Sequence, residues 1–242
     1  MLIYNKRYGK VMDNATKEFL SFLTDWTAAL PSMQASTVFQ KPETSAILSV
    51  DMTNAFCREG NLASPRVAAL INPITRLLQL AWDSGVRQIV LSQDCHTPDA
   101  YEFDAYAPHA VCGSSESEAV DEIKALPFYD QMMVFNKNSV AAEKNTGLNP
   151  WIESHPWLST FIVVGDCTDI CVYTLAMHLR TWANAFEREW RVIVPADCVD
   201  TYDLPLEAAR SIGAMPHPGD LLHTVFLYHM ALNGIEVVRN IT

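Results

Sequence analysis

The protein has 242 residues, 49% of them apolar, and a formal net charge of −11. This length and composition predict one globular α/β domain with an added segment, or two small domains, and a sizeable core. The negative charge argues against nucleic acid or an anionic membrane as the main partner.

Three further features of the composition concern the compartment. No apolar run approaches the length that spans a bilayer. The first ten residues hold three cations but no apolar segment follows them, so we expect no signal peptide. The six cysteines are scattered without a CxxC pair and do not indicate a disulfide framework. We therefore expect a cytoplasmic protein in a reducing compartment.

Residues 1–44 are predicted to form an N-terminal helical extension to a main domain at 45–242. Apolar and aromatic residues recur at helical spacing over 15–30, and Pro31 ends this helix. Its aromatic face must pack either on the domain itself or on a neighbouring subunit. Both possibilities stay open at this point, and we expect a homo-oligomer.

The main domain alternates between strand and helix patterns. Strands are predicted at 45–50, 87–91, 131–135, 161–165, 190–194 and 235–239, and helices at 65–84, 116–126, 148–155, 171–185, 206–214 and 220–233. This alternation implies a mostly parallel sheet of about six strands with helices on both faces, a three-layer α/β/α sandwich. The strands lack polar alternation, which indicates burial on both sides. Residues 95–114 form a long irregular segment of the kind that is often functional.

Four of the predicted strands lead into a residue whose side chain could act in catalysis or bind a ligand. Asp51, Asp94 and Lys137 come at or just after strand ends, and Cys171 follows the break of a strand at Gly165 by a few residues. In parallel sheets of this kind, ligands bind beyond the carboxyl ends of the strands. We therefore expect these side chains to share one site.

Cys171 lies where a strand turns into a helix, a position at which free N–H groups and the helix dipole favour a thiolate. Lys137 would lower the thiol pKa further, and Asp51 would accept the thiol proton and pass it to a leaving amine. Backbone N–H groups near Cys167 and Cys171 would hold the oxyanion. This chemistry is amide hydrolysis through a thioester. The alternatives are an inert core cysteine and an ordinary ion pair at a strand end.

A second cluster has the composition of a metal site. Asp94 and His96 are two residues apart and project to one side of an extended segment, and His109 follows in the irregular segment. One carboxylate and two imidazoles are credible ligands for a divalent metal, with Zn²⁺ expected and Mn²⁺ or Fe²⁺ possible. Cys95 should point away from this site, and Cys112 is not expected to be a ligand. The alternative is an ordinary polar loop.

Five stretches match known motifs in order and spacing. Asp51-Met-Thr-Asn-Ala-Phe56 resembles Asp-x-Gln-x-Asp-Phe, Asp94-Cys-His96 resembles Asp-Trp-His, and Tyr106-Ala-Pro-His109 resembles Trp-Pro-x-His. Lys137 with Thr146 and Leu148 resembles a catalytic lysine segment, and Gly165-Asp-Cys-Thr168-Asp-Ile-Cys171-Val resembles Gly-Val-Ala-Thr-Asp-x-Cys-Val. These motifs resemble the isochorismatase-like cysteine hydrolase superfamily, and within it the nicotinamidases, over about residues 45–200.

The resemblance implies a doubly wound sheet and a catalytic triad of Cys171, Asp51 and Lys137. It also implies a cis peptide bond between Asp166 and Cys167, in a turn that Thr168 helps to hold and that aims N–H groups at the oxyanion. In nicotinamidases the metal of the Asp-His-His set meets the pyridine nitrogen of the substrate. The aromatic residues that sandwich its ring correspond to Phe56 and Tyr106, for which plain core packing is the alternative.

The departures from the family pattern lie in the pocket walls and leave the triad intact. They are Thr53, Ala55, Cys95 and Tyr106, and Ala141-Ala142-Glu143 in place of Ser-Ala-Phe. The resemblance implies a small-molecule amide substrate, with nicotinamide converted to nicotinate and ammonia. The alternatives are another small amide, a carbamoyl compound or isochorismate as the substrate, and a non-enzymatic binding module.

Overall fold

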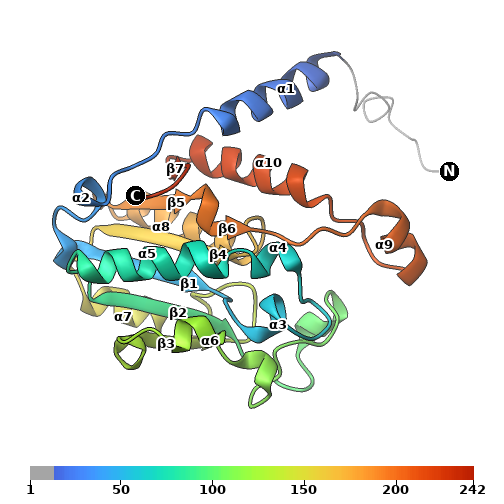
Figure 1. The fold of residues 1–242 in the computed structure, drawn as a ribbon, viewed down its shortest axis with the longest axis horizontal. Coiled ribbons are helices and arrows are strands. Elements are labelled where there is room, and N and C mark those ends of the chain that lie inside the picture. The colour runs from blue at the N-terminus through green and yellow to red at the C-terminus, as the bar shows by residue number, and fades with distance from the viewer. Residues whose placement is uncertain (1–13) are drawn as a thin grey trace.

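The computed structural model describes residues 14–242 and shows a central sheet between two layers of helices (Figure 1). The strand order is β3-β2-β1-β4-β5-β7, with β6 paired to β4, and the pairings between these strands are parallel. The strands are β1 (Ser45–Val50), β2 (Gln88–Asp94), β3 (Met133–Lys137), β4 (Thr160–Asp166), β5 (Arg191–Pro195), β6 (Val199–Asp200) and β7 (Glu236–Val238). The predicted fold class is confirmed, and the two-residue β6 is the strand that the prediction lacked.

Helices cover both faces of the sheet. The longer ones are α1 (Asn14–Ala28), α5 (Ile71–Asp83), α7 (Leu148–Ser154), α8 (Cys171–Ala185), α9 (Leu206–Ile212) and α10 (Gly219–Leu232). The short ones are α2 (Ala35–Val38), α3 (Asn54–Cys57), α4 (Pro65–Ala68) and α6 (Asp121–Lys124), with 3-10 turns η1 (Pro42–Thr44), η2 (Tyr101–Asp104), η3 (Ser115–Ser117), η4 (Tyr129–Gln131) and η5 (Ala196–Cys198). No helix among the residues described is both long and apolar enough to cross a bilayer.

Two hydrophobic cores follow from the pleat of the strands. Successive side chains point to opposite faces, so Ile47 of β1 joins one core and Leu48 the other. The first core packs the sheet against α5 and α6, and the second packs it against α7, α8 and α10. The carboxyl edge of the sheet is thereby held rigidly between the two helical layers.

Two predicted helices are shorter in the structure. The pattern at 65–84 splits into α4 and α5, because Pro73 lacks the N–H that would bond to the carbonyl of Ala69 in one continuous helix. The pattern at 116–126 contracts to α6, since the preceding residues form the 3-10 turn η3. Neither change moves a predicted site residue.

The described part of the extension, from residue 14 on, packs on its own chain, and residues 1–13 of the predicted extension lie outside the described residues. In Figure 1, α1 lies beside α10, and the rings of Phe19, Phe22 and Trp26 surround that of Tyr228 at centroid distances of 5.3–5.8 Å. Phe19 and Phe22 keep 44% and 46% of their surface exposed. The contact corresponds to packing on the domain, one of the two alternatives, and the homo-oligomer stays a prediction.

Candidate active site

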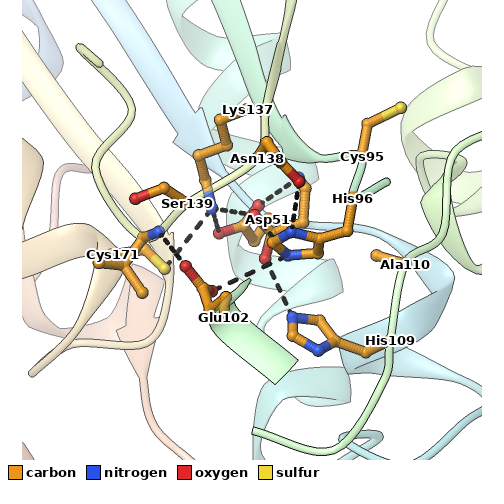
Figure 2. Close-up of polar contacts among 12 residues, drawn as sticks. Asp51, Cys95, His96, Glu102, His109, Ala110, Lys137, Asn138, Ser139 and Cys171 are labelled. Atoms are coloured by element: carbon orange, nitrogen blue, oxygen red, sulfur yellow. Dashed lines mark hydrogen bonds and ion pairs between the residues drawn. The ribbon is translucent and has the colours of Figure 1, made fainter. Parts of the chain in front are cut away.

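Four side chains meet at the carboxyl edge of the sheet. Asp51 follows β1, Asp94 and Lys137 end β2 and β3 as register partners, and Cys171 begins α8. Lys137 Nζ lies 2.8 Å from Asp51 Oδ2 and 3.6 Å from Cys171 Sγ, and it also pairs with Asp94 (Figure 2). All four side chains are buried. The structure therefore brings together the residues of the sequence-predicted triad.

The carboxylate of Asp51 is held by its own backbone and by β2. Asp51 has a positive φ of 54°, an unusual conformation for a residue other than glycine that is typical of functional sites. The N–H of Asp94 donates to Asp51 Oδ1 at 2.8 Å. Oδ2 is left to face Lys137.

The two carboxylates that share Lys137 differ in proton affinity. Burial and the charge of Asp94 raise the pKa of Asp51 to about 6, although Lys137 and a hydrogen bond with Cys171 favour its charged form. Burial also disfavours the Asp94 carboxylate, but Lys137 and the imidazoles of His109 and His96 outweigh this and lower its pKa. Asp51 is therefore the carboxylate better matched to proton exchange near neutral pH.

The thiol of Cys171 differs from the sequence-based expectation. Lys137 lowers its pKa as expected, but burial outweighs this effect and raises the pKa well above the ordinary cysteine value. The expected lowering of the thiol pKa is thus wrong, because desolvation of the charged form exceeds the stabilisation by the cation. Attack by Cys171 therefore depends on a neighbouring base that accepts the thiol proton.

The end of β4, just before the turn into α8, requires Gly165. Its φ is +112°, and a Cβ at this position would lie 1.9 Å from the carbonyl oxygen of Val50. The peptide bond between Asp166 and Cys167 is cis, which confirms what the resemblance implies. Burial raises the pKa of the Asp166 carboxyl well above its usual range.

The backbone amides of this turn have distinct partners. The N–H of Thr168 donates to the carbonyl of Asp200 at 2.9 Å, and the N–H groups of Ile170 and Val172 donate to that of Cys167. Cys171 is the first residue of α8, so the helix does not use its N–H. The N–H groups of Cys171 and Cys167 are the candidates for an oxyanion hole. The Thr168 hydroxyl is 2.9 Å from Nδ1 of His223, a contact that the sequence did not indicate.

Next to the triad lies a group that could hold a metal ion. It contains the three predicted residues Asp94, His96 and His109, and also Glu102, with candidate ligand atoms within 4.8 Å of one another. Nε2 of each histidine is 3.4 Å from an oxygen of Asp94, and His96 Nε2 is 3.9 Å from Glu102 Oε1. Glu102 was missed because it lies on η2, within the irregular segment, where no regular spacing relates it to the other ligands.

The two imidazoles are oriented as metal ligands usually are. Nδ1 of His96 donates to Oδ1 of Asn138, which also accepts from the N–H of Thr97, and Nδ1 of His109 donates to the carbonyl of Ala107. These bonds orient each ring so that its Nε2 faces the group, as they do for metal-ligating histidines. His96 Nε2 is buried without a hydrogen-bond partner. An orphaned buried nitrogen among two carboxylates fits a divalent cation.

Aromatic rings line the metal-binding group. The rings of Phe56 and Tyr106 lie 5.4 and 6.5 Å from that of His109. Phe103 was not predicted, and its ring lies 5.3 Å from His96 and 5.7 Å from His109. Phe56 is also a member of the first core, whereas Phe103 and Tyr106 are half-buried and form the accessible wall.

The cysteines require a correction. Cys95 and Cys112 form a disulfide, although their spacing did not indicate one. The irregular segment returns beside the end of β2, where His96 and Val111 form a parallel bridge, and this brings the two thiols together. The other four cysteines are free and buried.

The sequence and fold are similar to those of known proteins. The isochorismatase domain family matches residues 45–222. Nicotinamidase 1 of Arabidopsis thaliana is 29% identical over 221 residues, which cover 85% of this chain and 89% of the relative. The nicotinamidase of Escherichia coli (strain K12) is 25% identical over 211 residues, which cover 74% of this chain and 94% of the relative.

A solved structure adds a third similarity. N-carbamoylsarcosine amidase from Thermoplasma acidophilum has a TM-score of 0.59 and 25% identity, and the match covers 81% of this chain and 96% of that chain. The family match includes the strand ends, the metal-binding group and the turn before α8.

Proposed function

The chain belongs to the isochorismatase family, and we propose that it hydrolyses nicotinamide to nicotinate and ammonia through a thioester on Cys171. It is an amidohydrolase that acts on a carbon–nitrogen bond. The observation that carries the choice of substrate is the position of the metal-binding group and its aromatic wall directly beside the triad. A planar ring with a nitrogen ligand fits this arrangement of a metal-binding group and aromatic rings, and the two nicotinamidase relatives support the assignment.

In the proposed acylation step, Sγ of Cys171 attacks the amide carbon while its proton passes to Asp51. The N–H groups of Cys171 and Cys167 stabilise the oxyanion. Asp51 then gives the proton to the leaving nitrogen, the carbon–nitrogen bond breaks, and ammonia departs from the thioester. Lys137 keeps a positive charge throughout, because Asp51 and Asp94 raise its pKa well above the usual value despite burial.

Deacylation uses the same groups. Asp51, ionised again, takes a proton from water as the oxygen attacks the thioester carbon. The carbon–sulfur bond breaks, the proton passes from Asp51 to Cys171, and the product leaves as the carboxylic acid, which releases its proton to solvent to give nicotinate. Asp94, His96, Glu102 and His109 would hold a divalent metal, for which we propose zinc, and the metal would supply a Lewis acid for the pyridine nitrogen.

The test compares the wild type with Cys171→Ala. We expect ammonia release from nicotinamide to fall by roughly a thousandfold or more, since loss of a nucleophile removes the covalent route. Cys198→Ala removes a free, buried cysteine that lies outside the site, and it should retain activity. Unchanged hydrolysis by Cys171→Ala would refute the triad assignment.

A substrate panel separates nicotinamide from the other substrates of such hydrolases. Pyrazinamide should also be hydrolysed, because it keeps a ring nitrogen at the position equivalent to that of the pyridine nitrogen in nicotinamide. The carbamoyl compound N-carbamoylsarcosine is the second candidate, since the 25% identity to an amidase of that substrate favours it over other amides. A higher kcat/KM for N-carbamoylsarcosine or isochorismate than for nicotinamide would overturn the proposed substrate.

A further inference from the structure

The metal-binding group is assembled from two segments that are distant in sequence. Asp94 and His96 lie at the end of β2, and His109 lies on the segment that returns from the irregular loop. Two backbone hydrogen bonds join the segments: the N–H of His96 donates to the carbonyl of Ala110, and the N–H of Cys112 donates to that of His96, both at 2.9 Å. The geometry of the ligands therefore depends on how firmly these two segments are held together.

A covalent link reinforces this junction. Cys95 stands between the ligands Asp94 and His96, and Cys112 lies three residues beyond His109. Their disulfide joins the two segments directly, with the Cα atoms 4.5 Å apart. Among the described cysteines this is the one bonded pair, so a change of thiol redox state acts on the protein at the edge of the metal-binding group.

The bond is accessible from solvent. Cys112 is exposed and Cys95 is half-buried, whereas the four free cysteines are buried. The disulfide therefore lies closer to the protein surface, at its Cys112 end, than any of the free cysteines. In Figure 2 the Cys95 side chain extends away from the cluster of ligands, so the sulfur atoms act on the site by holding the backbone.

We propose that the Cys95–Cys112 disulfide is a redox-sensitive positioning element of the metal site, which binds metal tightly when the cysteines are oxidised and weakly when they are reduced. This inference rests on the metal site of the proposed function. A dithiol reductant attacks Cys112 Sγ, the sulfur–sulfur bond breaks, and a mixed disulfide forms. The second thiol of the reductant then releases Cys112, so that the two cysteines gain two electrons and two protons and the reductant becomes a disulfide.

A second contact explains why reduction should loosen the site without unfolding it. Oε2 of Glu116 accepts a hydrogen bond from the N–H of Ala110 at 2.9 Å, next to His109. This contact and the backbone bridge persist when the disulfide opens. His109 then remains near the other ligands but loses the covalent restraint, which makes the change reversible on reoxidation.

The experiment measures Zn²⁺ affinity by competition with a chromophoric chelator, without substrate. Four samples are compared: the oxidised wild type, the wild type treated with tris(2-carboxyethyl)phosphine, the double variant Cys95→Ser/Cys112→Ser, and Cys198→Ala as the matched control. The phosphine supplies the two electrons and becomes its oxide with oxygen from water. We expect about 10–100-fold weaker binding in the reduced wild type and in the double variant, as for loss of other groups that orient metal ligands.

The controls separate redox control from general damage. The double variant should no longer respond to the phosphine, Cys198→Ala should behave like the wild type, and reoxidation should restore affinity. Equal affinity of the oxidised and reduced wild type overturns the inference and leaves the proposed function standing. Absence of Zn²⁺ binding by the oxidised wild type overturns both the inference and the proposed metal, while ammonia release tests the amidase independently. If the double variant misfolds by circular dichroism, the two redox states of the wild type decide the outcome.

Discussion

At the scale of single residues, the turn that presents the nucleophile depends on Gly165. A Cβ at Gly165 would lie 1.9 Å from the backbone oxygen of Val50, and the φ of +112° suits glycine alone. We expect Gly165→Ala to lower the free energy of unfolding by about 3 kcal/mol or more, because β1 and β4 would have to separate. Urea unfolding measures this loss.

A second glycine provides the matched control. Gly213 also has a positive φ, of +70°, but no atom lies within 4 Å of the place where its Cβ would stand. Gly213→Ala therefore introduces only the strain of a non-glycine residue at positive φ, and it should lower the free energy of unfolding by about 1–2 kcal/mol. Equal losses in the two variants would show that the close approach to Val50 does not matter.

His223 links the turn to the pH dependence of stability. Its pKa is lowered by burial and by Arg66, and Asp200 opposes this shift. The nearby carboxylates of Asp169 and Asp220 also favour the charged form. The unfolded chain thus gains a proton near pH 6.5, before the folded chain does. The stabilisation from neutral His223 is complete above pH 6.5 and is lost as the pH falls below it.

This effect is measured by comparing the pH dependence of the free energy of unfolding in the wild type and in His223→Asn. Between pH 7 and 5, His223 should reduce the free energy of unfolding by no more than about 1.4 kcal/mol per pH unit. His223→Asn should make the decline shallower. His178, whose pKa is also lowered by burial, is present in both proteins and cancels in the comparison. Parallel stability curves would contradict the assignment to His223.

At the scale of elements, strands could be predicted more reliably than the loop that completes the site. β1 and β4 are mostly apolar and lack polar alternation because both of their faces are buried, and parallel pairing then brings Asp51 close to the turn before α8. Glu102 and Phe103 could not be placed, because tertiary contacts determine the path of their loop. One such contact is the hydrogen bond from the N–H of Val140 to Glu102.

The pKa of the nucleophile shows a second limit of sequence reasoning. A cysteine at a helix N-terminus near a lysine predicts a thiolate, and both features are present. The degree of burial is a property of the packed layers and cannot be read from the motif. It is this burial that raises the pKa of Cys171.

The contact between α1 and α10 supports a prediction about the extension. Tyr228 is the shared partner of three aromatic rings on α1, each in an edge-on arrangement. Tyr228→Ala should lower the free energy of unfolding by about 1–3 kcal/mol, through loss of buried area and of these ring pairs. It should also speed tryptic cleavage after Lys17, while kcat stays unchanged.

The control for this variant is Phe186→Ala, which truncates an aromatic ring that is 65% exposed at the end of α8. It should change neither the unfolding free energy nor the cleavage rate appreciably. If the two variants are equally stable, the aromatic cluster does not anchor α1 to the domain.

At the scale of the whole molecule, the metal-binding group couples the sheet to the loop that covers its edge. Asp94 belongs to β2, whereas Glu102 and His109 belong to the long connection between β2 and β3. A cation bound by all of them would add a further link between these two parts of the chain. Its binding energy should therefore appear in the stability of the entire fold.

This coupling gives a prediction for the thermal unfolding of the wild type and two histidine variants. At a Zn²⁺ concentration of 100 times Kd, binding to the folded chain alone adds about 2.7 kcal/mol. In a chain of this size that raises Tm by roughly 5–10 °C. The increase should vanish in His109→Ala and persist in His155→Ala, which removes an imidazole at the end of α7. Calorimetry with and without a chelator measures it, and an increase that survives in His109→Ala would place the ion elsewhere on the protein.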